Sequence, residues 1–294
     1  MSPADQPRRI AFLGSPALAV PVLEALVGHG YEVPLVVTRA DKRRGRGGEL
    51  SPSPVKAAAQ RLGLAVTDQV DELLEVGADV GVVVAFGRII KPHVLTQVPL
   101  VNLHFSLLPR WRGAAPVERA ILAGDHRTGV CLMDVAQELD TGGVYRRAEV
   151  EIGPDETLEE LRSRLVALGT ALLVDALHEG LGPPEPQVGE PTYAAKVDPA
   201  ELRLDWARSA VELSRVVRLG RAWTTAAGRR LIVWRSRLGD GALEGPPGTL
   251  AGTSVATGQG SLELLEVQPE GRGRQAAEAW RRGARVADGE QLGR

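Results

Sequence analysis

The stretch of this sequence best suited to chemistry is residues 101–116, which read VNLHFSLLPRWRGAAP. Asn102 and His104 are two residues apart at the end of an apolar segment, so on a β-strand their side chains point to the same face. An amide beside an imidazole can stabilise a negatively charged oxygen and transfer a proton. The pattern therefore predicts a catalytic pair, although a core histidine satisfied by Asn102 would also fit these residues.

A carboxylate suited to work with this pair is Asp140, which precedes a Gly-Gly turn after the next apolar segment. Ligands of open α/β sheets bind at the carboxyl ends of the strands, so we expect Asp140 to reach the crevice that holds His104. There it can orient the imidazole or take a proton itself. An aspartate that only bonds its own turn is the structural alternative.

Other kinds of catalysis lack their motifs. The turn after Gly14 has no second or third glycine of a dinucleotide-binding loop, and no GxxxxGK[ST] phosphate loop occurs. The histidines form no HExxH pair, no GxSxG elbow is present, and the single cysteine, Cys131, excludes a disulfide framework or a Cys-rich zinc module. We therefore expect neither a nucleotide cofactor nor a metal.

The elements that must position these residues alternate along the first half of the chain. Apolar segments predict strands at 9–14, 33–38, 80–86, 100–105 and 129–135. Helical spacing predicts helices at 21–27, 54–62 and 115–123, and a longer helix that begins with the capping box of Thr157 and Glu160. This alternation is typical of an α/β fold with a Rossmann-like, mostly parallel sheet covered by helices.

The pattern changes at residues 180–191, which hold four prolines and three glycines in twelve positions. Beyond them lie one helical segment at 210–219 and short strand candidates at 230–235, 248–256 and 261–267. We therefore expect a catalytic domain over 1–180, a linker over 181–200 and a small OB-like β-barrel over 201–294.

The charge of the chain is unevenly distributed. Its 294 residues carry a net charge of −2, but residues 200–294 hold 15 arginines against 11 acidic residues. Within 203–237 there are nine arginines against two acidic residues, and a second basic cluster covers 39–46. Arginine supplies 31 of the 35 basic residues, so a compositional bias is the alternative explanation for both clusters. Two separate basic clusters nevertheless favour a polyanion as partner.

The first residues, MSPADQPRRIAFLGS, lack the apolar stretch of a signal peptide, and no apolar run is long enough to span a bilayer. We expect a cytoplasmic protein without membrane contact. Nothing in the pattern demands an oligomer, so we expect a monomer.

Taken together, Asn102, His104, the SLLP run after it and Asp140 resemble the pattern of the folate-dependent formyltransferases. The likeness covers nearly the whole chain, through FLGSPALAVPVLEAL at 12–26, VVVAFGRIIKP at 82–92, PTYAAKVDPAELRLDW at 191–206 and LELLEVQPEGRGR at 262–274. The RWRGAAP extension and the C-terminal segments resemble those family members that act on methionyl initiator tRNA.

The resemblance implies transfer of a formyl group from the co-substrate 10-formyltetrahydrofolate to the α-amino group of methionyl initiator tRNA, without a metal. Asn102 and His104 would donate hydrogen bonds to the oxygen of a tetrahedral species. Asp140 would hold His104 and assist proton removal. The folate-binding stretch of the family corresponds to Ser106, Leu107, Leu108 and Pro109.

The basic loop at 39–53 resembles an insertion with which the family reaches the acceptor stem of tRNA. Its cations are Arg39, Lys42, Arg43, Arg44 and Arg46, and Arg46 matches the arginine of the family's GRG motif. A solvated charged loop is the structural alternative. The arginines at 203–237 would follow the inside of the L-shaped tRNA.

Two other functions remain open at this stage. One is an enzyme of the same family that formylates another amine, such as an amino sugar nucleotide, or the hydrolase module of a formyltetrahydrofolate dehydrogenase. Such enzymes should lack the basic loop and this C-terminal region. The other is an RNA-binding protein that has lost catalysis, against which the intact Asn–His–Asp spacing argues.

Overall fold

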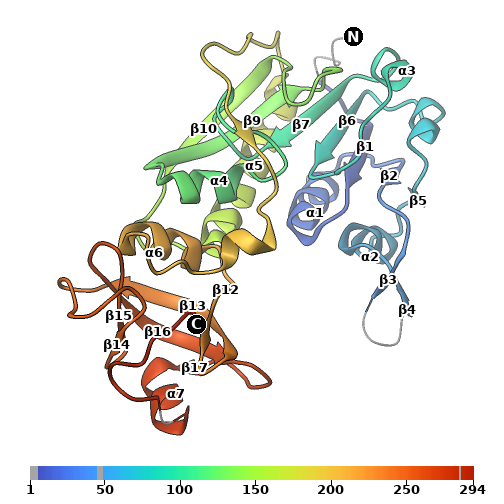
Figure 1. Ribbon diagram of the computed structural model, residues 1–294. Helices are drawn as coiled ribbons and strands as arrows, with labels where there is room; N and C mark the ends of the chain where they lie inside the picture. Colours follow the sequence, from blue (N-terminus) through green and yellow to red (C-terminus); the bar gives the residue numbers. More distant parts are fainter. Residues whose placement is uncertain (1–5, 45–48, 285) are drawn as a thin grey trace. The chain divides into compact units, whose positions relative to one another are not determined.

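The computed structural model describes residues 6–44, 49–284 and 286–294, and the chain forms two compact units (Figure 1). The first comprises residues 1–116, 127–151 and 162–195, and the second comprises residues 117–126, 152–161 and 196–294. The segment predicted as a linker is held against the first unit up to residue 195. There Glu185 pairs with Val144, and β11 (Tyr193–Ala194) pairs with β8 (Arg112–Gly113).

The first unit is built on a seven-stranded sheet, which confirms the predicted α/β class. In spatial order its strands are β10 (Val144–Glu151), β9 (Arg127–Asp134), β7 (Leu100–His104), β6 (Val80–Val84), β1 (Ile10–Gly14), β2 (Val36–Val37) and β5 (Val66–Thr67). The strands from β7 to β5 are parallel, while β9 and β10 are antiparallel to their neighbours. The chain order reverses between β1 and β6, the kind of switch point at which open sheets bind ligands.

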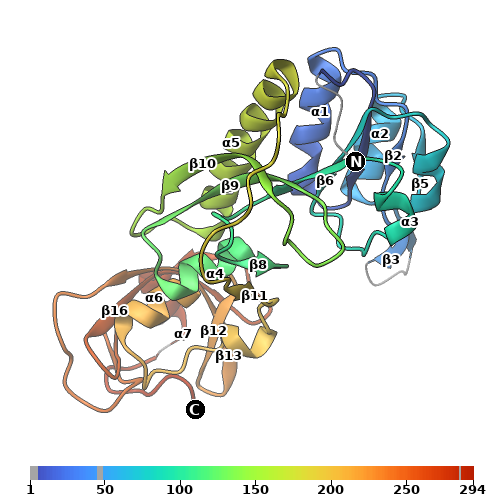
Figure 2. The same cartoon turned by 90° about the horizontal axis from the view of Figure 1, so that it is seen from above.

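Helices cover this sheet, as Figure 2 shows for α5 beside β9 and β10. The helices are α1 (Val20–Gly28), α2 (Pro54–Arg61), α3 (Pro92–Leu95) and α5 (Leu158–Glu179), with 3₁₀ segments at Ala17–Ala19 and Val70–Leu74. Strands β1 and β6 are buried along their whole length, which is why they read as unbroken apolar runs. The small antiparallel pair β3 (Lys42–Arg44) and β4 (Glu49–Ser51) lies within residues 39–53, the loop predicted to be basic.

The second unit is built on an antiparallel sheet, as expected for a small β domain. Its strands run in the order β12 (Ala222–Ala226), β13 (Arg229–Leu238), β16 (Ser261–Pro269), β15 (Ser254–Ala256) and β14 (Leu250–Ala251), with β17 (Gln275–Ala276) beside β16. The helical elements are α4 (Pro116–Ala123), α6 (Ala210–Arg218), α7 (Ala277–Ala284) and the 3₁₀ segment Pro199–Leu202. Trp206, Leu213 and Trp280 belong to the core that these elements enclose.

Strands β10 and β12 and helix α7 were not predicted. Strand β10 lies at the sheet edge, where most of its residues contact solvent, so it has no apolar run. No helix within the described parts of the chain has both the length and the apolar character needed to cross a bilayer.

Candidate active site

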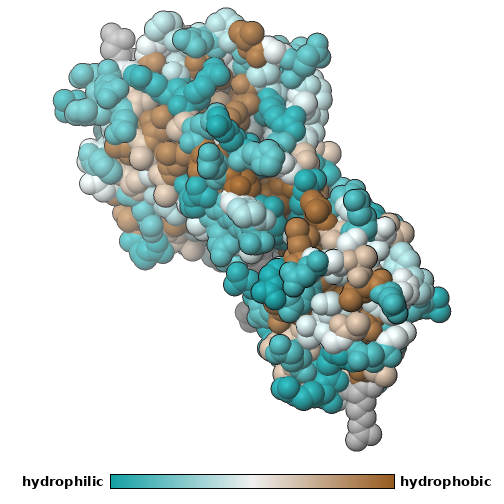
Figure 3. All heavy atoms as spheres, turned by 90° about the vertical axis from the view of Figure 1, so that its left-hand side faces the viewer, coloured by the Kyte–Doolittle hydropathy of each residue, from teal (hydrophilic) through white to brown (hydrophobic). Residues whose placement is uncertain are grey.

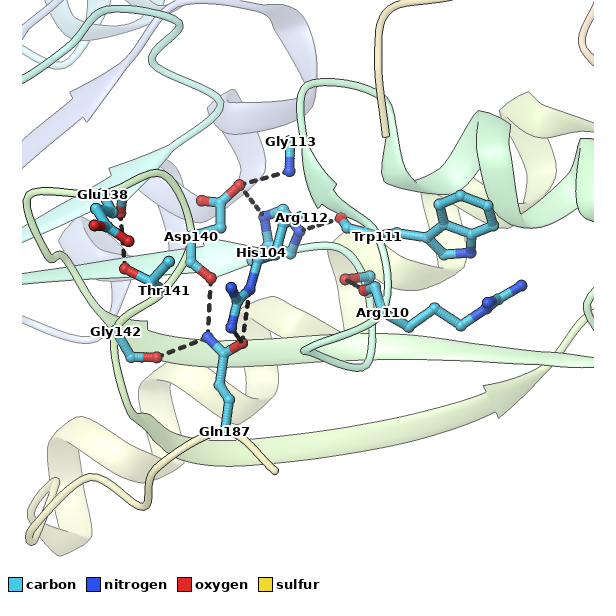
Figure 4. Close-up of polar contacts among 11 residues, drawn as sticks. His104, Arg110, Trp111, Arg112, Gly113, Glu138, Asp140, Thr141, Gly142 and Gln187 are labelled. Atoms are coloured by element: carbon cyan, nitrogen blue, oxygen red, sulfur yellow. Dashed lines mark hydrogen bonds and ion pairs between the residues drawn. The ribbon is translucent and has the colours of Figure 1, made fainter. Parts of the chain in front are cut away.

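His104 is the last residue of β7, at the carboxyl edge of the parallel part of the sheet. Its side chain is only 7% exposed, and both ring nitrogens face protein oxygens (Figure 4). Nε2 lies 2.9 Å from the Trp111 carbonyl oxygen, which can only accept, so Nε2 donates. Nδ1 lies 3.7 Å from Oδ2 of Asp140. The ring is thus fixed in orientation by two different segments of chain.

The carboxylate of Asp140 contacts a backbone amide as well as the His104 ring. Its carboxylate is 11% exposed, and Oδ2 accepts a hydrogen bond of 2.8 Å from the Gly113 amide. Gly113 has a φ of +122°, and a Cβ there would lie 2.9 Å from the Ala194 carbonyl oxygen, so only glycine fits. The hydrogen bond from Gly113 holds the carboxylate where its Oδ2 lies 3.7 Å from Nδ1 of His104.

Asp140 reaches His104 by a different path from the predicted one. Strand β9 runs antiparallel to β7, so its end at Asp134 lies opposite Val101, at the start of β7 rather than beside His104. The loop at 135–143 carries Asp140 back to the carboxyl edge. A hydrophobic run predicts a strand but not its direction. The predicted route of the chain to Asp140 was therefore wrong, whereas the predicted proximity of Asp140 to His104 was right.

Asn102 lies two residues before His104 on β7, so both side chains point to one face of the sheet. It is half-buried, with Met133 of β9 and Val83 of β6 opposite it in the sheet register. The structure therefore brings the three predicted polar residues to one region of the first unit.

The residues matched to the folate-binding stretch differ in their surroundings. Ser106 is fully buried and its hydroxyl donates to the Arg110 carbonyl at 2.6 Å. Leu108 is buried against Cys131, Met133 and Val144. Leu107 and Pro109 are half-buried, and the Leu108–Pro109 peptide bond is cis. The buried side chains of Ser106 and Leu108 therefore contact groups within the protein.

Sequence reasoning missed the residues that hold the segment after Pro109. The amide of Trp111, which has a φ of +64°, donates to the Thr192 hydroxyl at 2.9 Å. The Arg112 amide donates to the Thr192 carbonyl at 2.8 Å, and the Arg112 guanidinium donates to Gln187. Gln187 lies in the proline-rich stretch and Thr192 directly follows it, and isolated polar residues there carry no recognisable signal.

The single cysteine, Cys131, is buried and poorly suited to act as a nucleophile. Cys131 lies opposite His104 in the sheet register, and burial raises the pKa of its thiol above the ordinary value. A thiol that resists ionisation is a poor nucleophile. Among the described residues, no three His, Cys, Asp or Glu side chains form a group able to hold a metal.

The basic loop is only partly described. Lys42 and Arg43 lie exposed on β3, and Arg44 ends that strand. Near the base of the loop, Lys56 pairs with Asp41 at 2.8 Å. Arg46 falls outside the described residues, so its predicted contact stays a prediction.

Asp140 and Gln187 each have an exposed apolar residue next to them in the sequence. Leu139 precedes Asp140 and is 70% exposed, and Val188 follows Gln187 and is 86% exposed. Figure 3 shows hydrophobic residues, in brown, reaching the surface between hydrophilic ones on the side that it views. Two exposed apolar side chains therefore stand next in sequence to Asp140 and Gln187.

A strand-end histidine paired with a carboxylate, on a mostly parallel sheet that is followed by an antiparallel unit, is an arrangement suited to group transfer. Residues 8–177 match the family described as "Formyl transferase", and residues 196–285 match "Formyl transferase, C-terminal domain". The chain therefore belongs to the formyl transferase family.

A curated relative agrees with this assignment, and two solved structures share the fold. A methionyl-tRNA formyltransferase of Jannaschia sp. is 44% identical over 97% of this chain and 99% of its own length. The solved N-formyltransferase from Helicobacter canadensis, in complex with folinic acid and dTDP-3-aminofucose, aligns with a TM-score of 0.68 at 16% identity over 87% of this chain and 98% of its own. The solved methionyl-tRNA formyltransferase from Clostridium thermocellum aligns with a TM-score of 0.58 at 16% identity over 79% and 94%.

Proposed function

We propose that this chain transfers the formyl group of 10-formyltetrahydrofolate to the α-amino group of methionyl initiator tRNA. The observation that carries this function is the 44% identity to a methionyl-tRNA formyltransferase, which extends over 97% of this chain and 99% of the relative. The folate is a co-substrate that gives up its formyl group in each cycle.

The site residues supply what this transfer needs. The neutral amine attacks the formyl carbon and forms a tetrahedral centre whose oxygen carries negative charge. The bond from that carbon to N10 of the folate then breaks, the amine loses one proton, and N10 gains one. Asn102 and His104 donate hydrogen bonds to the oxygen, and donors of this kind contribute about 10²- to 10³-fold each in rate. Asp140 holds His104 and assists the proton transfer.

The contacts of the two His104 ring nitrogens indicate which nitrogen takes part. Nδ1 faces Asp140, so Nε2 is the donor available to substrate, and it donates to the Trp111 carbonyl in this structure. We propose that the formyl oxygen takes the position of this carbonyl when the substrates bind.

A direct assay tests the proposed function. The purified protein with 10-formyltetrahydrofolate should formylate initiator Met-tRNA and leave elongator Met-tRNA unmodified. A dTDP-linked amino sugar serves as the competing acceptor. Formylation of that sugar together with inactivity on initiator tRNA would contradict the proposal.

One face of the sheet in the second unit supports RNA as its partner. Trp223 on β12 and Trp234 on β13 are half-buried on the side away from the core. The guanidinium of Arg230 lies 4.4 Å from the Trp223 ring centre, and that of Arg274 lies 3.3 Å from the Trp234 ring centre. Aromatic rings with arginines over them can stack on bases while the charges meet phosphates. We call these four residues the tryptophan–arginine face.

Changing Arg230 to Gln should weaken tRNA binding without changing the chemical step. Loss of one phosphate contact should raise KM for tRNA several-fold and lower the salt slope of binding by about 1. Steady-state kinetics at several salt concentrations measure both effects. Arg282→Gln, at an exposed arginine of α7 outside this face, is the matched control. Equal effects in both variants would mean that only net charge matters.

The remaining expectations stay predictions. We propose that Lys42, Arg43, Arg44 and Arg46 contact the acceptor stem, which their charge and their place in the loop support. A translation enzyme acts in the cytoplasm, and light scattering on the purified protein can determine whether it is a monomer.

A further inference from the structure

Gln187 stands out within an exposed, proline-rich stretch. Between Gly182 and Glu190 every residue except Gln187 is exposed, and all of them are described. A glutamine that is half-buried among such neighbours is held by specific contacts rather than by a core. Figure 4 shows its side chain directed toward the loop that carries Asp140.

The amide of Gln187 uses its full hydrogen-bonding capacity. Nε2 donates to the carbonyl oxygens of Asp140 at 2.9 Å and of Gly142 at 2.8 Å. Oε1 accepts from Nε of Arg112 at 3.0 Å and from Nη2 at 2.6 Å. A side-chain amide has two N–H donors and one oxygen with two lone pairs, so no further partner can be served.

The carbonyl groups that Gln187 bonds belong to a strained and tightly packed segment of backbone. Asp140 has a φ of +53°, in the left-handed region that costs energy for residues other than glycine. Two residues further on, Gly142 is so close to Asp134 that a Cβ would lie 2.0 Å from the Asp134 carbonyl oxygen. The Gln187 amide bonds the carbonyls on both sides of this tight passage and so fixes the peptide planes around Asp140.

The contacts form a closed ring. The Asp140 carboxylate accepts from the Gly113 amide, Gly113 follows Arg112 in the chain, and Arg112 donates to Gln187. Gln187 in turn donates to the Asp140 carbonyl. Asp140 is therefore held at its carboxylate by one segment and at its backbone by another, and Gln187 joins the two.

We propose that Gln187 is a positioning residue for formyl transfer, which acts through the Asp140 backbone to keep the carboxylate facing His104. This inference rests on the proposed function and extends it to a residue that touches no reacting atom. Misplacing a catalytic group by about 1 Å can cost on the order of 100-fold in rate, so the orientation that Gln187 maintains matters for turnover.

Two variants of similar size separate its donors from its acceptor. Gln187→Met removes all four hydrogen bonds, whereas Gln187→Glu keeps an acceptor for Arg112 and loses both donors. We expect each to lower kcat by about 10- to 100-fold with KM for tRNA and folate nearly unchanged. Val188→Ala, at the exposed neighbour, should retain wild-type kcat. Rates are compared at a temperature where circular dichroism shows every variant folded.

A second measurement does not depend on the substrate. In ¹H–¹⁵N spectra, the imidazole signals of His104 should move in Gln187→Met in the same direction as in Asp140→Asn, and stay in place in Val188→Ala. Unmoved His104 signals, or a Gln187→Glu variant with wild-type kcat, would overturn the inference. If the wild-type protein formylated no acceptor while the His104 signals moved as expected, the proposed function would fail and the positioning role would stand.

Discussion

Replacement of His104 by alanine should lower kcat for formyl transfer by at least about 10³-fold, because it removes an oxyanion donor and a proton-transfer group together. The nearly buried ring is held between Asp140 and the Trp111 carbonyl. Single-turnover rates with enzyme in excess measure the loss over this range.

Binding measurements make this prediction specific. The Kd for tRNA should remain close to the wild-type value, since the proposed RNA contacts lie on other residues. His178→Ala is the matched control, because His178 is exposed near the end of α5. A His104→Ala variant that kept most of its activity would show that the candidate site is elsewhere.

Asp140→Asn should lower kcat by about 10²- to 10⁴-fold, the range over which positioned acid–base groups act. Asparagine has nearly the same shape, and its oxygen can still accept from the Gly113 amide. The change therefore removes the negative charge beside Nδ1 of His104 and leaves the loop intact. Kinetics of formyl transfer to initiator Met-tRNA provide the measurement.

The control for this variant comes from the same loop. Glu138 is an exposed carboxylate two residues earlier, and Glu138→Gln removes the same charge without touching His104. It should turn over at the wild-type rate. Equal losses in the two variants would mean that Asp140 acts only through the overall charge of the loop.

How far the sequence predicts this fold depends on where each strand lies. Strands β1, β6 and β7 are buried on both faces, and their apolar runs identified them. Strand β10 was missed because an edge strand in contact with solvent needs no such run. The antiparallel direction of β9 was missed because the order of apolar residues contains no information on direction.

The residues of the candidate site also fall into those that the sequence identifies and those that it does not. Asn102, His104 and Asp140 could be found because their side chains have distinctive chemistry and stand beside strand ends or turns. Gln187 and Thr192 could not be found, because they act through ordinary hydrogen bonds to backbone groups that are distant in sequence. Such contacts exist only once the chain has folded.

The antiparallel β9 also limits how this enzyme can change in length. The loop that carries Asp140 leaves and re-enters the sheet at one place, where the Asp134 amide bonds the Gly143 carbonyl at 2.8 Å. Its two ends are therefore fixed, and one residue inserted or deleted before Asp140 would slide the carboxylate along the loop. Insertions in related enzymes should accumulate in other surface loops and spare this one. The number of residues between Asp134 and Gly143 thus determines where the Asp140 carboxylate lies.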